Sequence, residues 1–210
     1  MLKTVIINDL VYSINYDKMT ANVVSIISSN SEIIIPQFII YEFQEYFVTR
    51  ISQGAFKDSI TTKSVQFPID SKIKTIEKDA FAFSSIESIV LPSNLTELKE
   101  GWCHGLRNLT QISILPNNER YSIYDDKYII SKSTITSENY DTIVFAVRDI
   151  KIAEIPDFIK IIGPYSFSEC KQLSKVETTK NSKLRLIEKY AFYNSSINCI
   201  IGSANLSVLV

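Results

Sequence analysis

Short runs in which apolar and polar residues alternate recur along the chain. The clearest are Val65-Gln-Phe67, Ile89-Val-Leu91, Ile112-Ser-Ile114 and Val176-Glu-Thr178. Because successive side chains of a strand point to opposite faces, each run predicts a short strand with its apolar pair turned inward. Proline follows three of the runs, at Pro68, Pro92 and Pro116, and ends the strand because it cannot donate to a sheet ladder.

A longer phrase precedes the alternating runs. IEKDAFAFSSI (residues 76–86) and IEKYAFYNSSI (residues 187–197) are identical at eight of eleven positions. Alignment on this phrase places a leading apolar residue at Ile51, Ile76, Leu98, Ile162 and Ile187. Five residues later come Phe56, Phe81, Cys103, Phe167 and Phe192. A recurring apolar pattern of this period is typical of a leucine-rich-repeat solenoid, whose coils stack because one coil alone cannot bury its apolar side.

In four copies a small residue stands directly before the phenylalanine, as in Ala80-Phe81 and Ser166-Phe167. The small residue lets neighbouring backbones approach, and the aromatic ring fills the centre of the coil. We expect a short helical turn to carry this pair in each repeat. The predicted fold is therefore a leucine-rich-repeat solenoid of the α/β horseshoe class, β-rich, with inserted β-hairpins.

Two segments lie outside this pattern and resemble each other. Tyr12-Ser-Ile-Asn-Tyr-Asp-Lys18 is similar to Tyr121-Ser-Ile-Tyr-Asp-Asp-Lys127, and Ile35-Pro-Gln-Phe-Ile39 is similar to Ile155-Pro-Asp-Phe-Ile159. We interpret both segments as β-hairpins. The chain then divides into a β-rich N-terminal cap segment at 1–47, leucine-rich repeats 1–3 at 48–118, a β-hairpin island at 119–154 and repeats 4–5 at 155–210, which together form one continuous solenoid.

The side chains next to the inward apolar residues face out of the predicted sheet and form a column from coil to coil. The column comprises Ser64, Gln66, Ser88, Val90, Gln111, Ser113, Lys175 and Glu177, and is continued by Cys199 and Ile201. Solenoids bind partners through such an extended face. We predict a shallow strip that contacts a protein or a glycan; the alternative is a solvated face without a ligand.

Four tyrosines offer a second candidate surface in the island. They are Tyr121, Tyr124, Tyr128 and Tyr140. Exposed tyrosines are enriched in binding surfaces. The alternative, which we weigh more heavily, is that they pack on a hairpin.

One stretch, Gly101-Trp-Cys-His-Gly105, matches the nucleophile elbow of a hydrolase. Cysteine catalysis needs a histidine and an acid that converge on the thiol from elsewhere in the fold. His104 is the only histidine and adjoins Cys103, so their side chains diverge, and the repeat alignment puts Cys103 where the buried phenylalanine belongs. We predict a degenerate coil turn and no catalytic residue, with a Cys hydrolase as a remote alternative.

Metal and cofactor sites are not predicted. A metal needs three or four converging side chains, whereas the single histidine and the cysteines Cys103, Cys170 and Cys199 fall on different coils. The three thiols are expected to be unpaired and packed as small hydrophobes. No Gly-rich phosphate loop is present.

Composition narrows the classes of partner. The 210 residues carry a net charge of -1 and no basic run, which argues against nucleic acid and anionic membranes. No apolar run has the length of a membrane span, and Asn8 and Asp9 interrupt the first one too early for a secretory signal. Four N-x-S/T triplets matter only if the chain enters a secretory pathway. They begin at Asn94, Asn108, Asn194 and Asn205.

The repeated phrase, continued by Cys or Ser and by the alternating run with its proline, resembles the BspA-like leucine-rich repeat. IGPYSFSECKQLSKVE (residues 162–177) is close to that consensus, including Cys170 and Leu173. SENYDTIVFAVRDI (residues 137–150), followed by IPDFIKIIGPYSF, is also similar to the BspA-like surface antigens of parasitic trichomonad flagellates.

This resemblance implies a non-enzymatic binding or adhesion module that engages a protein or a glycan, such as host matrix or a host cell surface. It implies a place at the cell surface or outside the cell, while the lack of a leader leaves a cytoplasmic location open. The alternative function is an intracellular leucine-rich-repeat scaffold that uses the same face for protein–protein interaction. The ligand, the oligomeric state and whether the chain is a fragment do not follow from the sequence.

Overall fold

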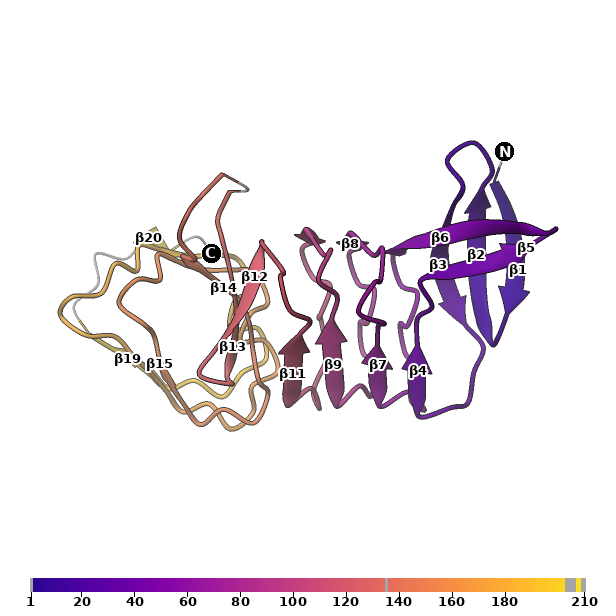
Figure 1. Ribbon diagram of the computed structural model, residues 1–210. Coiled ribbons are helices and arrows are strands. Elements are labelled where there is room, and N and C mark those ends of the chain that lie inside the picture. Colours follow the sequence, from indigo (N-terminus) through magenta and orange to yellow (C-terminus); the bar gives the residue numbers. More distant parts are fainter. Residues whose placement is uncertain (1, 135, 203–206, 209–210) are drawn as a thin grey trace. The chain divides into compact units, whose positions relative to one another are not determined.

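The protein is described by a computed structural model that covers residues 2–134, 136–202 and 207–208. These residues form β-strands and turns, with no helix among them (Figure 1). The chain divides into two compact units. Unit 1 comprises residues 1–106 and 113–119, and unit 2 comprises residues 107–112 and 120–210.

Unit 1 contains a seven-stranded sheet in the order β1-β2-β3-β6-β8-β10, with β5 paired to β6. The bounds are Leu2–Ile7 for β1, Leu10–Asn15 for β2, Thr20–Ile26 for β3, Phe38–Tyr41 for β5, Gln44–Ile51 for β6, Thr75–Ile76 for β8 and Glu97–Leu98 for β10. The β1-β2, β2-β3 and β5-β6 pairs are antiparallel, whereas β3, β6, β8 and β10 run parallel. Strands β3, β6, β8 and β10 are the back strands of unit 1.

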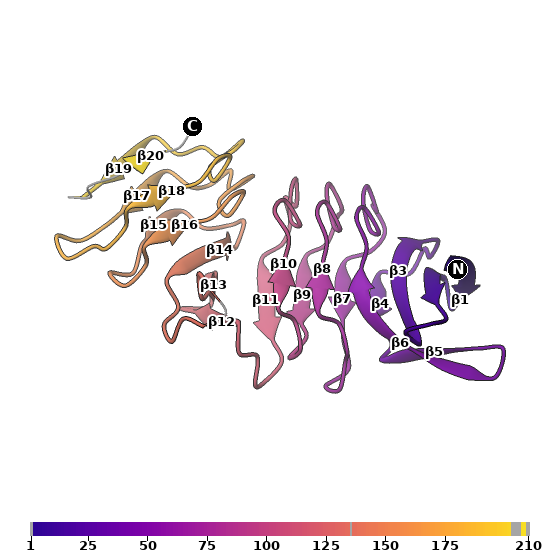
Figure 2. The ribbon, with the colours of Figure 1, turned by 90° about the horizontal axis from the view of Figure 1, so that it is seen from above.

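A second sheet, which we call the front sheet, has the order β11-β9-β7-β4 (Figure 2). Its strands are β4 at Glu32–Ile34, β7 at Ser64–Gln66, β9 at Ser88–Leu91 and β11 at Gln111–Ile114. Strands β4, β7 and β9 are parallel to one another. Each coil therefore contributes one short strand to the front and one to the back.

Unit 2 follows the same plan. Its back sheet has the order β12-β13-β14-β16-β18-β20, and its front sheet has the order β15-β17-β19. The back strands are β12 at Tyr121–Tyr124, β13 at Tyr128–Ser131, β14 at Thr142–Ala146, β16 at Ile161–Ile162, β18 at Leu186–Ile187 and β20 at Ser207–Val208. The front strands, which are parallel, are β15 at Ile152–Glu154, β17 at Lys175–Glu177 and β19 at Cys199–Ile201.

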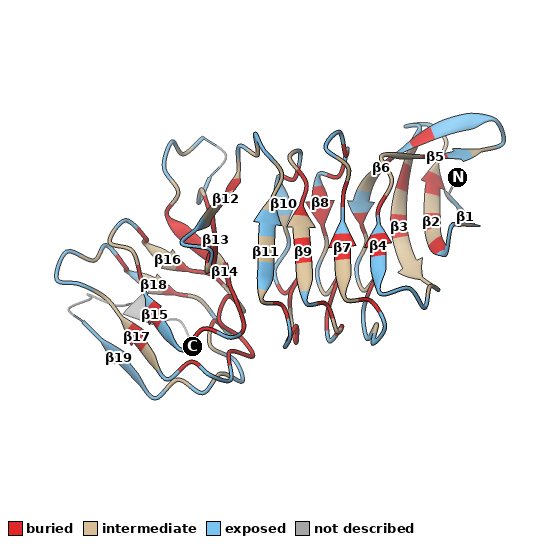
Figure 3. Ribbon diagram, turned by 60° about the horizontal axis from the view of Figure 1, so that its bottom comes forward, coloured by how far each residue is buried: buried red, intermediate tan, exposed pale blue. Residues whose placement is uncertain are grey.

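The alternating runs form the front strands for the reason the sequence predicts. Val65, Ile89 and Val176 are at most 1% exposed, while the residues on either side of each lie outside the core (Figure 3). The leading residues Ile51, Ile76 and Ile162 are fully buried on the back strands, Ile187 is 6% exposed, and Leu98 is half-buried. The predicted β-rich solenoid of stacked coils is confirmed.

A column of aromatic rings fills the centre of the coils. In unit 1 the ring of Phe81 packs between Phe56, at a centroid distance of 5.1 Å, and Trp102, at 6.4 Å. In unit 2 the Phe167 ring stacks on Phe192 at 5.1 Å. Phe56, Phe81 and Phe167 are fully buried. We call the position that these rings share, five residues after the leading apolar residue, the plug position.

The predicted short helical turns, and with them the α/β horseshoe class, are not found in the described residues. Each coil instead makes a tight turn with two left-handed residues, one two positions before the plug and one two positions after it. The pairs are Gly54 and Asp58, Asp79 and Phe83, Gly101 and Gly105, Tyr165 and Glu169, and Tyr190 and Asn194, all with φ between 55° and 74°. A right-handed helix needs φ near –60° throughout, so two positive values within five residues exclude it.

The backbone groups of these turns bond to the neighbouring coil. Within unit 1, the amide of Phe56 donates to the carbonyl of Ala80 at 2.7 Å, and that of Phe81 donates to the carbonyl of Trp102 at 3.2 Å. In unit 2 the amide of Phe167 donates to the carbonyl of Ala191 at 2.8 Å. These bonds satisfy buried polar groups that a helix would have satisfied internally.

Residues 32–35 belong to a coil, although the sequence analysis placed them in the cap segment. Ile33 pairs with Val65 on the front, and the amide of Ile35 donates to the carbonyl of Gln66 at 2.9 Å. In unit 2 Ala153 pairs with Val176, and the amide of Ile155 makes the equivalent bond to Glu177. The similarity of the two Ile-Pro stretches thus reflects equivalent places in two coils. The division into four segments at 1–47, 48–118, 119–154 and 155–210 stays a prediction.

Candidate functional site

The column predicted to bind a partner lies on the front strands. On the sheet β11-β9-β7-β4, Gln66, Gln111 and Ser113 are exposed, and their column neighbours Ser64, Ser88 and Val90 are half-buried. Register aligns Ser64 with Ser88 across β7 and β9. In unit 2 Lys175 and Glu177 are half-buried on β17. None of the eight side chains belongs to the core.

The structure extends the column by residues that the sequence analysis did not include. On β4, Glu32 and Ile34 pair with Ser64 and Gln66, and the Ile34 side chain is 66% exposed. On β15, Ile152 and Glu154 hold the equivalent places in unit 2 and are exposed. The signal was present in the sequence, because both strands are followed by Ile-Pro, much as β7 is followed by Phe67-Pro68 and β11 by Leu115-Pro116.

The chemistry of the two front columns differs. In unit 1 the column offers hydroxyl and amide groups with two aliphatic side chains, and Glu32 is its only charged member. In unit 2 Lys175 and Glu177 form an ion pair, and the carboxylate of Glu177 raises the pKa of Lys175. Shallow faces with hydrogen-bonding and aliphatic groups suit reversible contact with another macromolecule rather than a chemical step.

The elbow-like stretch Gly101–Gly105 has a structural explanation. Both glycines occupy the left-handed turn positions, with φ of 74° and 69°, and Cys103 is a plug that is 1% exposed. The ring of His104 packs on Phe83 at 4.7 Å, with its Nδ1 3.7 Å from Asp79 Oδ1. The thiol of Cys103 therefore points into the coil, whereas the imidazole of His104 stays at the turn. This arrangement does not place a general base beside the thiol, as nucleophilic catalysis would require.

The tyrosines of the island divide into two kinds. Tyr121 and Tyr128 are buried, and Tyr128 packs its ring on Phe167 at 6.0 Å. Tyr124 is 38% exposed and packs edge-on against Phe158 at 5.4 Å, while Tyr140 is half-buried. Tyr121 and Tyr128 thus pack in the core, whereas Tyr124 and Tyr140 are accessible at the surface.

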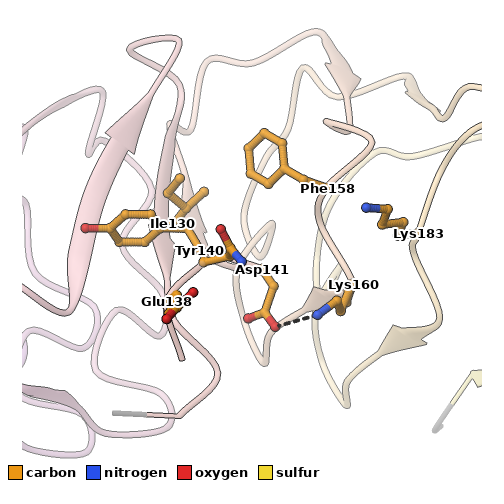
Figure 4. A pocket seen from close by; sticks show the side chains of 8 residues that line it. Ile130, Glu138, Tyr140, Asp141, Phe158, Lys160 and Lys183 are labelled. Carbon is orange, nitrogen blue, oxygen red and sulfur yellow. Dashed lines mark hydrogen bonds and ion pairs between the residues drawn. The ribbon is translucent and has the colours of Figure 1, made fainter. Parts of the chain in front are cut away.

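A pocket of about 400 Å³ opens in unit 2 beside Tyr140 (Figure 4). It was not predicted, because its residues come from four separate stretches of the chain. The lining residues are Ile130, Glu138, Asn139, Tyr140, Asp141, Phe158, Lys160 and Lys183. Its volume falls within the range of small-molecule sites.

Asp141 forms one wall of this pocket and is almost completely buried. Its Oδ1 accepts hydrogen bonds from the Ser133 amide at 2.9 Å and the Thr142 hydroxyl at 3.2 Å. Its Oδ2 accepts from the Ser133 hydroxyl at 3.0 Å and lies 3.4 Å from Nζ of Lys160. Local hydrogen bonds therefore satisfy the Asp141 carboxylate, and Lys160 is only a distant partner.

The sequons occupy different surroundings. Asn94 and Asn108 are exposed, although the side-chain amide of Asn94 donates to the carbonyl of Ser71 at 2.7 Å. The amide of Asn194 donates to both oxygens of the buried Glu169, at 2.9 and 2.8 Å. Asn205 lies outside the described residues.

The described residues contain neither a metal-binding cluster nor a membrane-spanning helix. No cluster of three or more His, Cys, Asp or Glu side chains is placed to hold a metal ion in residues 2–134, 136–202 and 207–208. Nor does this part of the chain contain a helix that could span a membrane.

Coils that stack around buried plugs, each with a front and a back strand, define a β-solenoid protein of the leucine-rich-repeat class. The sequence profile described as "BspA type Leucine rich repeat region (6 copies)" matches residues 41–143 and 138–209. The chain belongs to the BspA-type leucine-rich repeat family, as its repeat consensus predicted.

Solved structures share the fold at low sequence identity. A leucine-rich repeat protein from Bacteroides ovatus aligns over 97% of this chain and 57% of its own, at 17% identity and a TM-score of 0.61. The T. pallidum leucine-rich repeat protein aligns over 95% of this chain and 86% of its own, at 15% identity and a TM-score of 0.50. This chain thus spans less than two thirds of the B. ovatus protein. No curated protein matches the chain.

Proposed function

We propose that the protein is a non-enzymatic binding or adhesion module that engages a protein or a glycan through its front sheets. Membership of a repeat family supports a binding role, because stacked repeats offer one extended face to a partner. The proposed contacts are the column residues on β7, β9, β11 and β17, which are Ser64, Gln66, Ser88, Val90, Gln111, Ser113, Lys175 and Glu177.

The arrangement of the unit 1 column is the observation that carries this proposal. Its hydroxyl and amide groups lie outside the core on consecutive strands, which are about 4.8 Å apart in a sheet. Packing of the coils does not require these side chains, since the inward residues supply it. A partner that contacts several coils would gather many weak contacts along one line.

The place of action that we propose is the cell surface or the extracellular space, with host matrix or host cells as partners. The support is the resemblance to BspA-like surface antigens. An intracellular scaffold would use the same face, so location decides between the two. Immunostaining of intact and permeabilised cells separates them: staining of intact cells supports the surface, and staining only after permeabilisation contradicts it.

Lysines on the front column should abolish binding without unfolding the protein. We expect the triple variant Gln66→Lys, Val90→Lys and Ser113→Lys to lose binding to immobilised matrix proteins and glycans that the unchanged protein binds. Each substitution affects a residue outside the core and should cost less than about 0.5 kcal/mol of stability. Circular dichroism and melting temperature should therefore stay unchanged, while binding in surface plasmon resonance disappears.

A matched control separates the face from the added charge. Gln44→Lys, Gln53→Lys and Ile60→Lys also add three positive charges to unit 1, at exposed positions away from the front strands. This variant should bind like the unchanged protein. Equal losses in both triple variants would show a general charge effect, and equal binding by both would remove the front column as the contact surface.

A further inference from the structure

The pocket beside Tyr140 is a separate candidate site, and it does not depend on the proposed role of the front sheets. Phe158, Lys160 and Lys183 lie in the connections that lead from front strands to back strands of unit 2. The opposite side is formed by Glu138, Asn139 and neighbouring residues in the connection between β13 and β14.

Two ammonium groups give the pocket its positive side. Figure 4 shows Lys160 and Lys183 on the same side, with both ammonium groups directed toward the interior. Lys160 is 40% exposed, and its long contact to Asp141 leaves donors for a ligand, because an ammonium carries three. Within the described part of the chain, the ammonium of Lys183 has no ion pair or hydrogen bond. The two groups are therefore available to an anion.

The buried Asp141 offsets part of this positive charge, because its Oδ2 forms an ion pair with Nζ of Lys160 at 3.4 Å. Its oxygens accept three hydrogen bonds from Ser133 and Thr142 at 2.9–3.2 Å. The carboxylate is thus held against the wall by its own neighbours. Lys183, whose ammonium has no ion pair among the described residues, therefore supplies the positive charge that is left for an anion.

Aromatic side chains give the pocket an apolar surface. Phe158 is 37% exposed and Tyr140 is half-buried, so both side chains are accessible from the pocket that they line. Ile130, which is 4% exposed, adds an aliphatic contact. Small-molecule sites combine such aromatic surfaces with a few placed polar groups.

The remaining polar groups identify the ligand class. Glu138 and Asn139 are exposed at the rim, and an ionised carboxylate such as that of Glu138 only accepts hydrogen bonds. A fitting ligand must therefore donate as well as carry a negative charge. An acidic peptide supplies the charge, but its further carboxylates would be repelled by Glu138.

We propose that this pocket binds a sugar acid, that is, a pyranose ring that carries a carboxylate, such as a hexuronic acid unit. The carboxylate would lie between the ammonium groups of Lys160 and Lys183. The C–H face of the ring would contact Phe158 or Tyr140, and the hydroxyl groups would donate to Glu138 and accept from the amide of Asn139. An acidic polysaccharide would present this unit many times, which raises the avidity of a weak single contact.

Titration of the full-length ¹⁵N-labelled protein with glucuronic acid tests the proposal by NMR. We expect shifts concentrated at Asn139, Tyr140, Lys160 and Lys183, with a Kd of about 1 mM for a single sugar unit. Glucose, which has the same ring without the carboxylate, should bind at least about tenfold more weakly, because charge-assisted hydrogen bonds are lost. Added salt should weaken the binding of glucuronic acid, because exposed charges are screened.

The variant Lys183→Gln tests the charge itself. Lys183 is exposed and carries no ion pair among the described residues, so the melting temperature should not change, while the affinity for glucuronic acid should fall about tenfold. Lys180→Gln is the matched control, since Lys180 is exposed in the same connection but does not line the pocket. It should bind like the unchanged protein.

Four results would overturn the proposal. Equal affinity for glucose and glucuronic acid would remove the role of the carboxylate, and unchanged affinity in Lys183→Gln would remove the role of the lysine. Absence of shifts at about ten times the expected Kd would exclude a sugar acid. Stronger binding of a tetraglutamate peptide than of glucuronic acid would assign the pocket to acidic peptides instead.

Discussion

Replacement of Phe81 by alanine should lower the free energy of unfolding of unit 1 by about 3–5 kcal/mol. The ring is fully buried and contacts the rings of Phe56 and Trp102 in the coils before and after it. Its removal leaves a cavity that two neighbouring coils share, and tightly packed interiors relax only in part around such a cavity. The loss should therefore exceed that of an ordinary surface substitution several-fold.

Urea unfolding monitored by the fluorescence of Trp102 measures this loss, because Trp102 is the only tryptophan and lies in unit 1. Phe43→Ala is the control, since the Phe43 side chain is completely exposed at the tip of the β5-β6 hairpin. It should cost less than about 0.5 kcal/mol. A loss below about 1 kcal/mol for Phe81→Ala would contradict the plug assignment.

Gly105→Ala should destabilise unit 1 by about 2–4 kcal/mol for two separate reasons. The residue has φ of 69°, where any side chain is strained, and an added Cβ would lie 2.4 Å from Cδ1 of Phe83. The Phe83 ring, which also packs on His104, would have to move. The same urea experiment measures the combined effect.

Gly54→Ala separates the two causes. Gly54 has nearly the same φ, 67°, but an added Cβ would meet its nearest neighbour at an ordinary 3.8 Å. It should therefore cost only the left-handed penalty of about 1–2 kcal/mol. Equal losses in the free energy of unfolding for the two variants would contradict the close approach of the Phe83 ring to residue 105. If Gly105→Ala is neutral, the turn is not left-handed, and the elbow interpretation of Gly101–Gly105 returns.

The sequence correctly predicted which side chains of the coils face inward and which face outward. Side chains alternate between the two faces of a strand with a period of two residues, and proline marks the end of the strand. Val65 and Ile89 are buried, and Gln66 and Val90 are not, for that reason alone. The plug position followed from the repeat alignment, even where Cys103 replaces phenylalanine. Both signals are local and recur in each coil, so errors in one copy are corrected by the others.

The turns were predicted wrongly because their conformation depends on contacts between coils. Gly54, Gly101 and Gly105 are clear signals for positive φ, but Phe83, Tyr165 and Tyr190 adopt it too, and such residues rarely do. For Phe83, a backbone bond to the next coil stabilises this conformation, since its amide donates to the carbonyl of His104 at 3.0 Å. A single repeat does not reveal this, since its hydrogen-bond partners are more than twenty residues away in the chain.

The sugar-acid pocket was missed for a related reason. Phe158 and Lys183 come from successive coils, and Tyr140 comes from the connection between β13 and β14. No short motif joins them, and each alone has an ordinary surface explanation. Only the stacking of the coils in unit 2 brings the two lysines to one side of the same cavity.

The natural cysteines report directly on the central claim, that the repeat register decides which side chains face the core. Cys103 holds a plug position, Cys170 is fully buried, and Cys199 lies exposed on front strand β19. The thiolate is the reactive form, and burial raises the pKa of Cys170 despite the nearby Arg148 guanidinium. The three thiols should therefore differ strongly in reactivity.

Labelling of the unmodified native protein with a thiol reagent, followed by peptide mass spectrometry, measures the rate for each cysteine. We expect Cys199 to be labelled promptly, and Cys103 and Cys170 to be labelled only after unfolding in urea. Labelling of Cys103 in the native protein as fast as Cys199 would contradict the register, and with it the assignment of the front column as the outer face.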